Sequence, residues 1–74
     1  MVLTIKLFAT FRKGRFDVAE EEVPEGTTVA ELVARHRLPV GEIGVVLVNG
    51  RHVELSARPP AGATVAIFPL LGGG

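Results

Sequence analysis

The chain lacks several residue types on which small proteins often rely for stability or chemistry. It has no cysteine, tryptophan or tyrosine among its 74 residues. The absence of cysteine excludes disulfides, thiolate metal sites and a cysteine nucleophile, so packing and hydrogen bonds must hold the fold. A chain of this length forms one compact domain and leaves no room for a separate substrate domain.

Long apolar runs and an excess of charge are also absent. No apolar run approaches the roughly 20 residues of a membrane-spanning helix, and residues 1–6 lack the basic start and apolar core of a signal peptide. Eight Lys and Arg are matched by eight Asp and Glu. The short basic clusters at residues 12–15 and 35–37 have no accompanying run of aromatics. We therefore expect a cytoplasmic protein that binds neither nucleic acid nor a membrane.

Hydrophobic periodicity predicts a hairpin at the start of the chain. Alternating apolar residues indicate a strand at residues 2–8, and residues 16–23 are expected to return as its partner. Phe16 and Val23 have opposite parities, which predicts a bulge or a frayed end at residues 20–22. The three glutamates at those positions are expected to form a solvated edge.

A helix is expected after the turn that follows this hairpin. Thr28 and Glu31 have the spacing of a capping box, and the apolar residues that follow recur at helical intervals up to His36. Pro39 ends the helix soon afterwards. A lone histidine at the end of such a stripe is more often a boundary residue than a ligand, so we assign His36 no chemistry.

The second half of the chain predicts three more strands. Residues 44–48 are apolar on both parities, which is typical of a strand covered on two faces or of one whose outer face meets a partner. Asn49-Gly50 predicts a hairpin turn into a short strand at residues 51–55. A last strand is expected at residues 64–68, where Pro69 terminates pairing.

The order of these elements predicts an α+β fold. We expect a mixed sheet of four to five strands with one main helix packed across it. This is the β-grasp arrangement, in which the first and last strands lie side by side and parallel in the middle of the sheet.

Several short segments carry a family resemblance. Residues 8–12 read Phe-Ala-Thr-Phe-Arg, residues 23–29 and 48–50 form turns with helix-start and hairpin signals, and residues 65–69 lead into a glycine-rich end. Together they resemble the MoaD and ThiS family of ubiquitin-like sulfur carriers over nearly the whole chain. The segment at residues 8–12 favours the molybdopterin branch, because it is similar to the small subunit of molybdopterin synthase.

The resemblance implies a ubiquitin-like domain at residues 1–69 and a flexible, functional tail at residues 70–74. An E1-like adenylating enzyme, MoeB-like or ThiF-like, would use ATP to convert the carboxylate of Gly74 to an acyl-adenylate. A sulfur donor would displace AMP, and the thiocarboxylate next to Gly73 would deliver sulfur in a MoaE-like large catalytic subunit of molybdopterin synthase. No bound cofactor or metal is expected, and the chain is expected to be no enzyme by itself.

Partner contacts are expected around the base of the tail. Phe8 and Phe68 have the parity opposite to Ile5 and Ile67, so we place them outside the core. Phe8 and Phe11 either join Phe68 in this docking patch or cap a secondary core beneath the loop that carries Arg12. The full set of predicted partner-binding residues is Phe8, Phe11, Arg12, Phe68, Pro69, Leu70, Leu71 and Gly72.

Other functions are compatible with the same tail. Within sulfur transfer, the acceptor pathway could be thiamine, cysteine or tRNA thiolation. A ubiquitin-like modifier would instead join Gly74 to lysines of target proteins, and a plain binding module would leave the tail idle.

Overall fold

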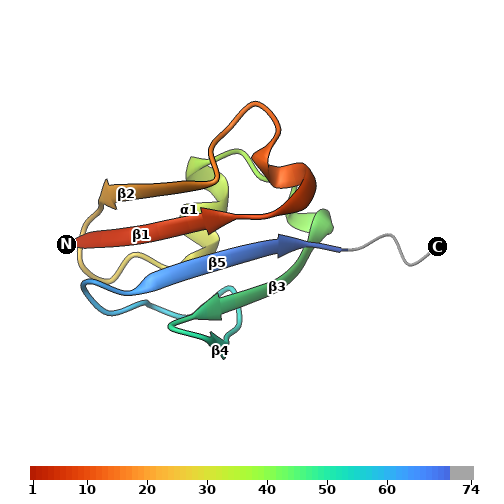
Figure 1. Ribbon diagram of the computed structural model, residues 1–74. Coiled ribbons are helices and arrows are strands. Elements are labelled where there is room, and N and C mark those ends of the chain that lie inside the picture. Colours follow the sequence, from red (N-terminus) through yellow and green to blue (C-terminus); the bar gives the residue numbers. More distant parts are fainter. Residues whose placement is uncertain (71–74) are drawn as a thin grey trace.

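The computed structural model describes residues 1–70, and they form one five-stranded mixed sheet crossed by a single α-helix (Figure 1). The strand order is β2-β1-β5-β3-β4. The predicted β-grasp fold is confirmed. The elements are β1 (Val2–Leu7), η1 (Ala9–Arg12), β2 (Val18–Glu22), α1 (Val29–Arg35), η2 (Val40–Glu42), β3 (Ile43–Val48), β4 (Arg51–His52) and β5 (Thr64–Pro69). No helix in this part of the chain is long and apolar enough to cross a membrane.

The two central strands supply the middle of the core. β1 and β5 pair in parallel, with the register running from Thr4 opposite Thr64 to Leu7 opposite Ile67. Successive side chains of a strand point to opposite faces, so alternate residues turn toward α1. The residues on that face are fully buried: Leu3, Ile5, Leu7, Val65 and Ile67.

The bulge or frayed end predicted at residues 20–22 of the second strand is not found there. The pairing of β1 with β2 runs without a register shift from Val2 opposite Glu22 to Lys6 opposite Val18. The change of side occurs before the strand begins: Phe16 packs against the core from the preceding loop, whereas Val18 is 55% exposed. Phe16 lies outside β2, so the alternation of side chains within that strand does not apply to Phe16 and Val18.

The helix begins as the sequence indicates. The Thr28 side chain accepts a hydrogen bond from the Glu31 N–H at 3.1 Å, and the Thr28 N–H donates to Glu31 Oε1 at 2.8 Å. This capping box satisfies two of the donors that a helix start leaves free. α1 then buries Val29, Leu32 and Val33 against the sheet.

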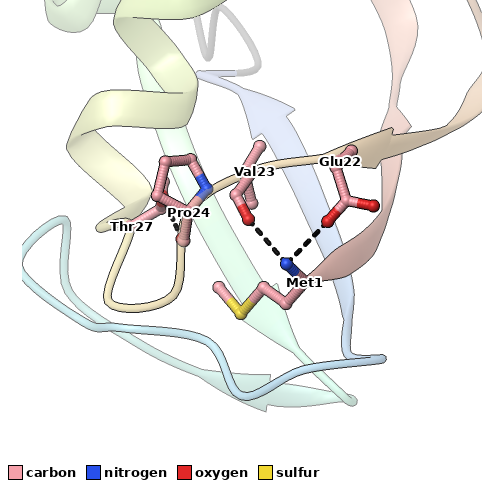
Figure 2. Close-up of polar contacts among 5 residues, drawn as sticks. All are labelled: Met1, Glu22, Val23, Pro24 and Thr27. Atoms are coloured by element: carbon pink, nitrogen blue, oxygen red, sulfur yellow. Dashed lines mark hydrogen bonds and ion pairs between the residues drawn. The ribbon is translucent and has the colours of Figure 1, made fainter.

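Figure 2 shows how the end of the sheet away from the β5 terminus is closed. The Met1 amino group donates to Glu22 Oε2 at 2.7 Å and to the Val23 carbonyl at 2.8 Å. The Val23 N–H donates in return to the Met1 carbonyl at 2.8 Å. In the turn that follows, the Thr27 hydroxyl donates to the Pro24 carbonyl at 2.6 Å. These contacts join β1 to the connection between β2 and α1.

The capping box makes helix stability depend on pH. The pKa of Glu31 is lowered, chiefly because its carboxylate accepts a hydrogen bond from the Thr28 backbone N–H and also one from the Thr28 hydroxyl. A carboxyl group with a lowered folded-state pKa stabilises the fold above its unfolded pKa, and this contribution is lost as the pH falls through the folded-state pKa. Glu31→Gln is therefore expected to be less stable than the wild type at neutral pH.

That stability difference should shrink as the pH falls through and below the usual glutamate value of 4.5. Urea unfolding at several pH values measures it. Glu25→Gln is the control, because no side-chain hydrogen bond or ion pair of Glu25 is found within residues 1–70. A difference for Glu31→Gln that is the same at acidic and neutral pH would contradict the role of its charge.

Candidate functional site

The base of the predicted tail is fixed by the end of β5. Leu70 follows this strand directly, and its N–H donates to the Glu42 carbonyl of η2 at 2.8 Å. The Leu70 side chain is 60% exposed. The predicted site residues Leu71, Gly72, Gly73 and Gly74 lie outside the described residues, so the division at residue 70 between domain and tail stays a prediction.

An open apolar hollow of about 450 Å³ lies at this base. In β3, Val46 and Val48 are buried in the core, so Val45 and Leu47, at the alternate positions, point to the opposite face of the sheet. Val45 is 40% exposed. The full lining is Gly44, Val45, Leu47, Phe68, Pro69 and Leu70. Apolar surface of this kind is a common feature of protein contact sites.

An aromatic stack continues this surface across β1. The rings of Phe8 and Phe68 are stacked, with centroids 4.1 Å apart and planes inclined by 11°. The Arg12 guanidinium lies 5.2 Å from the centroid of the Phe8 ring. The placement of both phenylalanines outside the core is confirmed, since each is only half-buried. Their binding of a partner stays a prediction.

Arg12 is held in place by the fold. Its Nε donates to the Leu7 carbonyl at 2.9 Å and lies 3.6 Å from a carboxylate oxygen of Asp17. These two contacts hold the guanidinium over the face of the Phe8 ring. It therefore presents a positioned cation beside the apolar surface.

The expectation that Phe11 belongs to an exposed docking patch is wrong. Phe11 is only 2% exposed and lies in the hydrophobic core. The chain leaves β1 and turns into η1, where Ala9 has a φ of 51°, and this turn directs Phe11 inward. The alternative expectation, a core role, is the one that holds. Pro69 is also buried and offers a partner little surface beyond its side of the hollow.

Sequence reasoning missed an ion pair between β2 and α1. Glu21 Oε1 lies 2.8 Å from His36 Nε2 and 3.3 Å from Arg35 Nε, and the His36 ring meets Phe16 edge-on. Glu21 is thus no solvated edge residue, because its side chain turns toward the helix. The contact is structural, and no group of three or more His, Cys, Asp or Glu within residues 1–70 is placed to hold a metal ion.

Comparison with known proteins identifies the family. Residues 5–74 match the model of the ThiS family, a match that includes the glycine-rich end. The chain belongs to the ThiS family. The resemblance drawn from residues 8–12, 23–29, 48–50 and 65–69 is therefore confirmed. A search of curated proteins finds no match.

Solved structures similar to this chain include a small archaeal modifier protein and subunits of molybdopterin converting factors. SAMP1 from Haloferax volcanii is 28% identical, with a TM-score of 0.75 and full coverage of both chains. A putative molybdopterin converting factor subunit 1 from Pyrococcus furiosus is 32% identical, with a TM-score of 0.72 and coverage of 93% of this chain and 97% of its own. A complex of subunits 1 and 2 of the molybdopterin-converting factor from Helicobacter pylori also matches. Its matching chain is 15% identical, with a TM-score of 0.67 and full coverage of both chains. At this identity the similarity shows the fold alone.

The ThiS-family domain thus has the fold of ubiquitin-like sulfur carriers and modifiers. In the described part of the chain, its distinctive surface is the combination of the apolar hollow, the Phe8–Phe68 stack and Leu70. All three lie where β5 ends, so any partner that receives the residues beyond Leu70 would meet this surface.

The two phenylalanines of the 8–12 segment should respond differently to truncation. Phe11→Ala is expected to lower the free energy of unfolding by about 3–5 kcal/mol, because it leaves a cavity in the core. Phe8→Ala loses a half-exposed stack and should cost on the order of 1 kcal/mol. Urea unfolding measures both, and Phe11→Leu supplies a milder core variant should Phe11→Ala not fold. Equal losses for Phe8 and Phe11 would contradict the assignment of only Phe11 to the core.

Proposed function

We propose that this domain is a sulfur carrier whose Gly74 carboxylate is converted to a thiocarboxylate. The observation that carries the proposal is the ThiS-family match, which runs from the β-grasp core through the glycine-rich end to residue 74. The anchored Leu70 and the apolar surface beside it support the proposal, because the last described residue lies beside a surface suited to protein contact.

The proposed chemistry begins with activation by an E1-like adenylating enzyme. A carboxylate oxygen of Gly74 attacks the α-phosphorus of ATP, and pyrophosphate leaves. Hydrosulfide then attacks the acyl carbon, the bond from carbon to the adenylate oxygen breaks, and AMP leaves. Activation is needed because a carboxylate has no good leaving group, whereas AMP is one. The ATP belongs to the enzyme, and no cofactor is proposed to stay on this domain.

The proposed pathway is molybdopterin biosynthesis, with a MoaE-like large subunit as the partner that accepts the sulfur. Support comes from the similarity to the Pyrococcus furiosus molybdopterin converting factor subunit 1 at 32% identity and from the sequence of residues 8–12. Sulfur transfer for thiamine, cysteine or tRNA thiolation uses the same activated end. These pathways are distinguished by identifying the acceptor protein that stimulates release of the sulfur.

The length and composition of the segment after Leu70 suit the proposed delivery into a neighbouring active site. Leu70 is anchored, so the four residues after it span at most about 14 Å when extended. Glycine passes through narrow channels and adopts backbone angles that other residues avoid. We propose that Leu70, Phe68 and Phe8 contact the partner while Gly73 and Gly74 enter its active site, and that Arg12, Leu71 and Gly72 complete the contact.

Intact mass spectrometry tests the carrier function. The protein is incubated with ATP, magnesium, sodium sulfide and an adenylating enzyme from the same organism. The expected result is a mass increase equal to the replacement of one oxygen by sulfur, absent without ATP and absent in a variant that lacks Gly74. An unchanged mass with an enzyme shown to be active on its own substrate would contradict the proposal.

A modifier function is the second candidate, and one observation favours it. Among the structural neighbours is small archaeal modifier protein 1 from Haloferax volcanii, at 27% identity and a TM-score of 0.71 over 92% of this chain and 95% of its own. A modifier would join Gly74 to a lysine amine with loss of AMP from the same adenylate. Peptide mass spectrometry of a cell lysate supplied with the tagged protein and ATP distinguishes the two, because only a modifier yields lysines linked to Gly74. A binding module would retain its function without Gly74.

A further inference from the structure

The close approach of β3 to the end of β5 depends on the absence of a side chain at Gly44. β3 pairs with β5 through Ile43 opposite Pro69 and Val45 opposite Phe68, and the register shifts between Ile43 and Val45. Gly44 is therefore the additional residue of a bulge. A β-bulge bends its strand and often serves to redirect the chain near a functional site.

The three heavy atoms nearest to a Cβ atom added at Gly44 would all be backbone atoms. This Cβ atom would lie 2.7 Å from the Pro69 carbonyl oxygen, 2.9 Å from the Pro69 carbonyl carbon and 3.0 Å from the Leu70 nitrogen. Backbone atoms cannot swing aside as the end of a flexible side chain can. A methyl group at this position therefore has to displace the peptide that joins Pro69 to Leu70.

The requirement at Gly44 is for space, not for an unusual backbone conformation. Among the glycines of residues 1–70, those with positive φ are Gly14, Gly26, Gly50 and Gly62, and Gly44 is not among them. Alanine at position 44 is compatible with the local backbone angles, so its effect falls on the neighbouring strand.

The peptide that Gly44 faces is also the one held by η2. The Leu70 N–H donates to the Glu42 carbonyl at 2.8 Å, and the Glu42 N–H donates to the Pro39 carbonyl at 2.9 Å. The Pro69 ring limits how its own φ can adapt, so a displacement of its carbonyl passes to Leu70. The last described peptide is thus bonded to the Glu42 carbonyl through the Leu70 N–H and lies too close to Gly44 to leave room for a side chain there.

We propose that Gly44 and the Glu42 carbonyl form a tail clasp that sets the direction in which the chain continues beyond Leu70. Gly44 is then a positioning residue for the reaction at Gly74. This inference rests on the proposed function for its catalytic consequence, but the clasp itself does not. Because a misplacement of about 1 Å can cost up to about a hundredfold in rate, a shifted tail base should slow activation.

Gly44→Ala tests the clasp, and Gly41→Ala is the matched control. Gly41 lies in η2, has no positive φ, and a Cβ added there would meet nothing within 4 Å. Amide hydrogen exchange followed by NMR reports on the Leu70 N–H directly. Gly44→Ala is expected to speed exchange at Leu70 by at least about tenfold more than at core amides such as those of Ile5 and Val65, while Gly41→Ala leaves Leu70 unchanged.

Global destabilisation is distinguished from a local effect by the same spectra. If Gly44→Ala destabilises the whole domain, all three amides exchange faster together, and the measurement is repeated in sulfate, which favours the folded state. Equal acceleration at Leu70 and at the core amides under both conditions, or unchanged exchange at Leu70, would overturn the clasp.

The catalytic consequence is measured as kcat/KM for pyrophosphate release with the adenylating enzyme. We expect a loss of about tenfold to a hundredfold for Gly44→Ala and a change below twofold for Gly41→Ala. If the wild type gains sulfur and Gly44→Ala reacts equally fast, the positioning role fails and the carrier function stands. If the wild type gains no sulfur, the carrier function fails, and the exchange experiment alone decides whether the clasp exists.

Discussion

The parallel pairing of β1 with β5 is the contact on which the rest of the structure depends. It joins residues about sixty positions apart in the chain, from Thr4 with Thr64 to Leu7 with Ile67. Because parallel strands run in the same direction, the segments that leave them emerge at the same edge of the sheet. Phe8 therefore stacks on Phe68. Phe68 and Leu70 line the same hollow, so the strand pairing alone brings the stack to the base of the tail. The pairing that builds the core also assembles the surface at the base of the tail.

Local signals in the sequence predicted the elements that local physics decides. The capping box of Thr28 and Glu31 is satisfied within four residues, and the turn at Asn49 and Gly50 needs only positive φ values, which both residues adopt. The alternation in β1 predicted its buried face because a strand with one covered side has a fixed parity. The β-grasp order then followed from the sequence of elements.

The failures come from contacts that periodicity does not encode. Strand parity stops at Leu7, where the chain turns into η1, so it had no bearing on Phe11, which the turn directs inward. Glu21 reads as one of three solvated acids, yet its partner His36 caps the C-terminal end of α1, fifteen residues away. The predicted strand at residues 51–55 is also too long, since β4 pairs only through Arg51 and His52. Each outcome was set by tertiary contacts, which override local pattern.

The apolar character of β3 on both parities is explained by unequal faces. Val46 and Val48 lie in the core, whereas Val45 and Leu47 line the open hollow on the opposite face. Two expectations were open for this strand: a second layer of structure over its outer face, or an outer face that meets a partner. No second layer is found within residues 1–70. Apolar groups left in water cost free energy unless binding removes them from it, so this face fits the proposed transient contact with an activating enzyme and an acceptor.

The lack of cysteine takes on a second meaning if Gly74 is activated as proposed. An acyl-adenylate reacts with any thiolate within reach, and thiolates are among the strongest nucleophiles that proteins carry. A chain without cysteine cannot acylate itself in this way. The same composition that leaves the fold without disulfides therefore also removes the thiolates that could compete with the sulfur donor for an activated end.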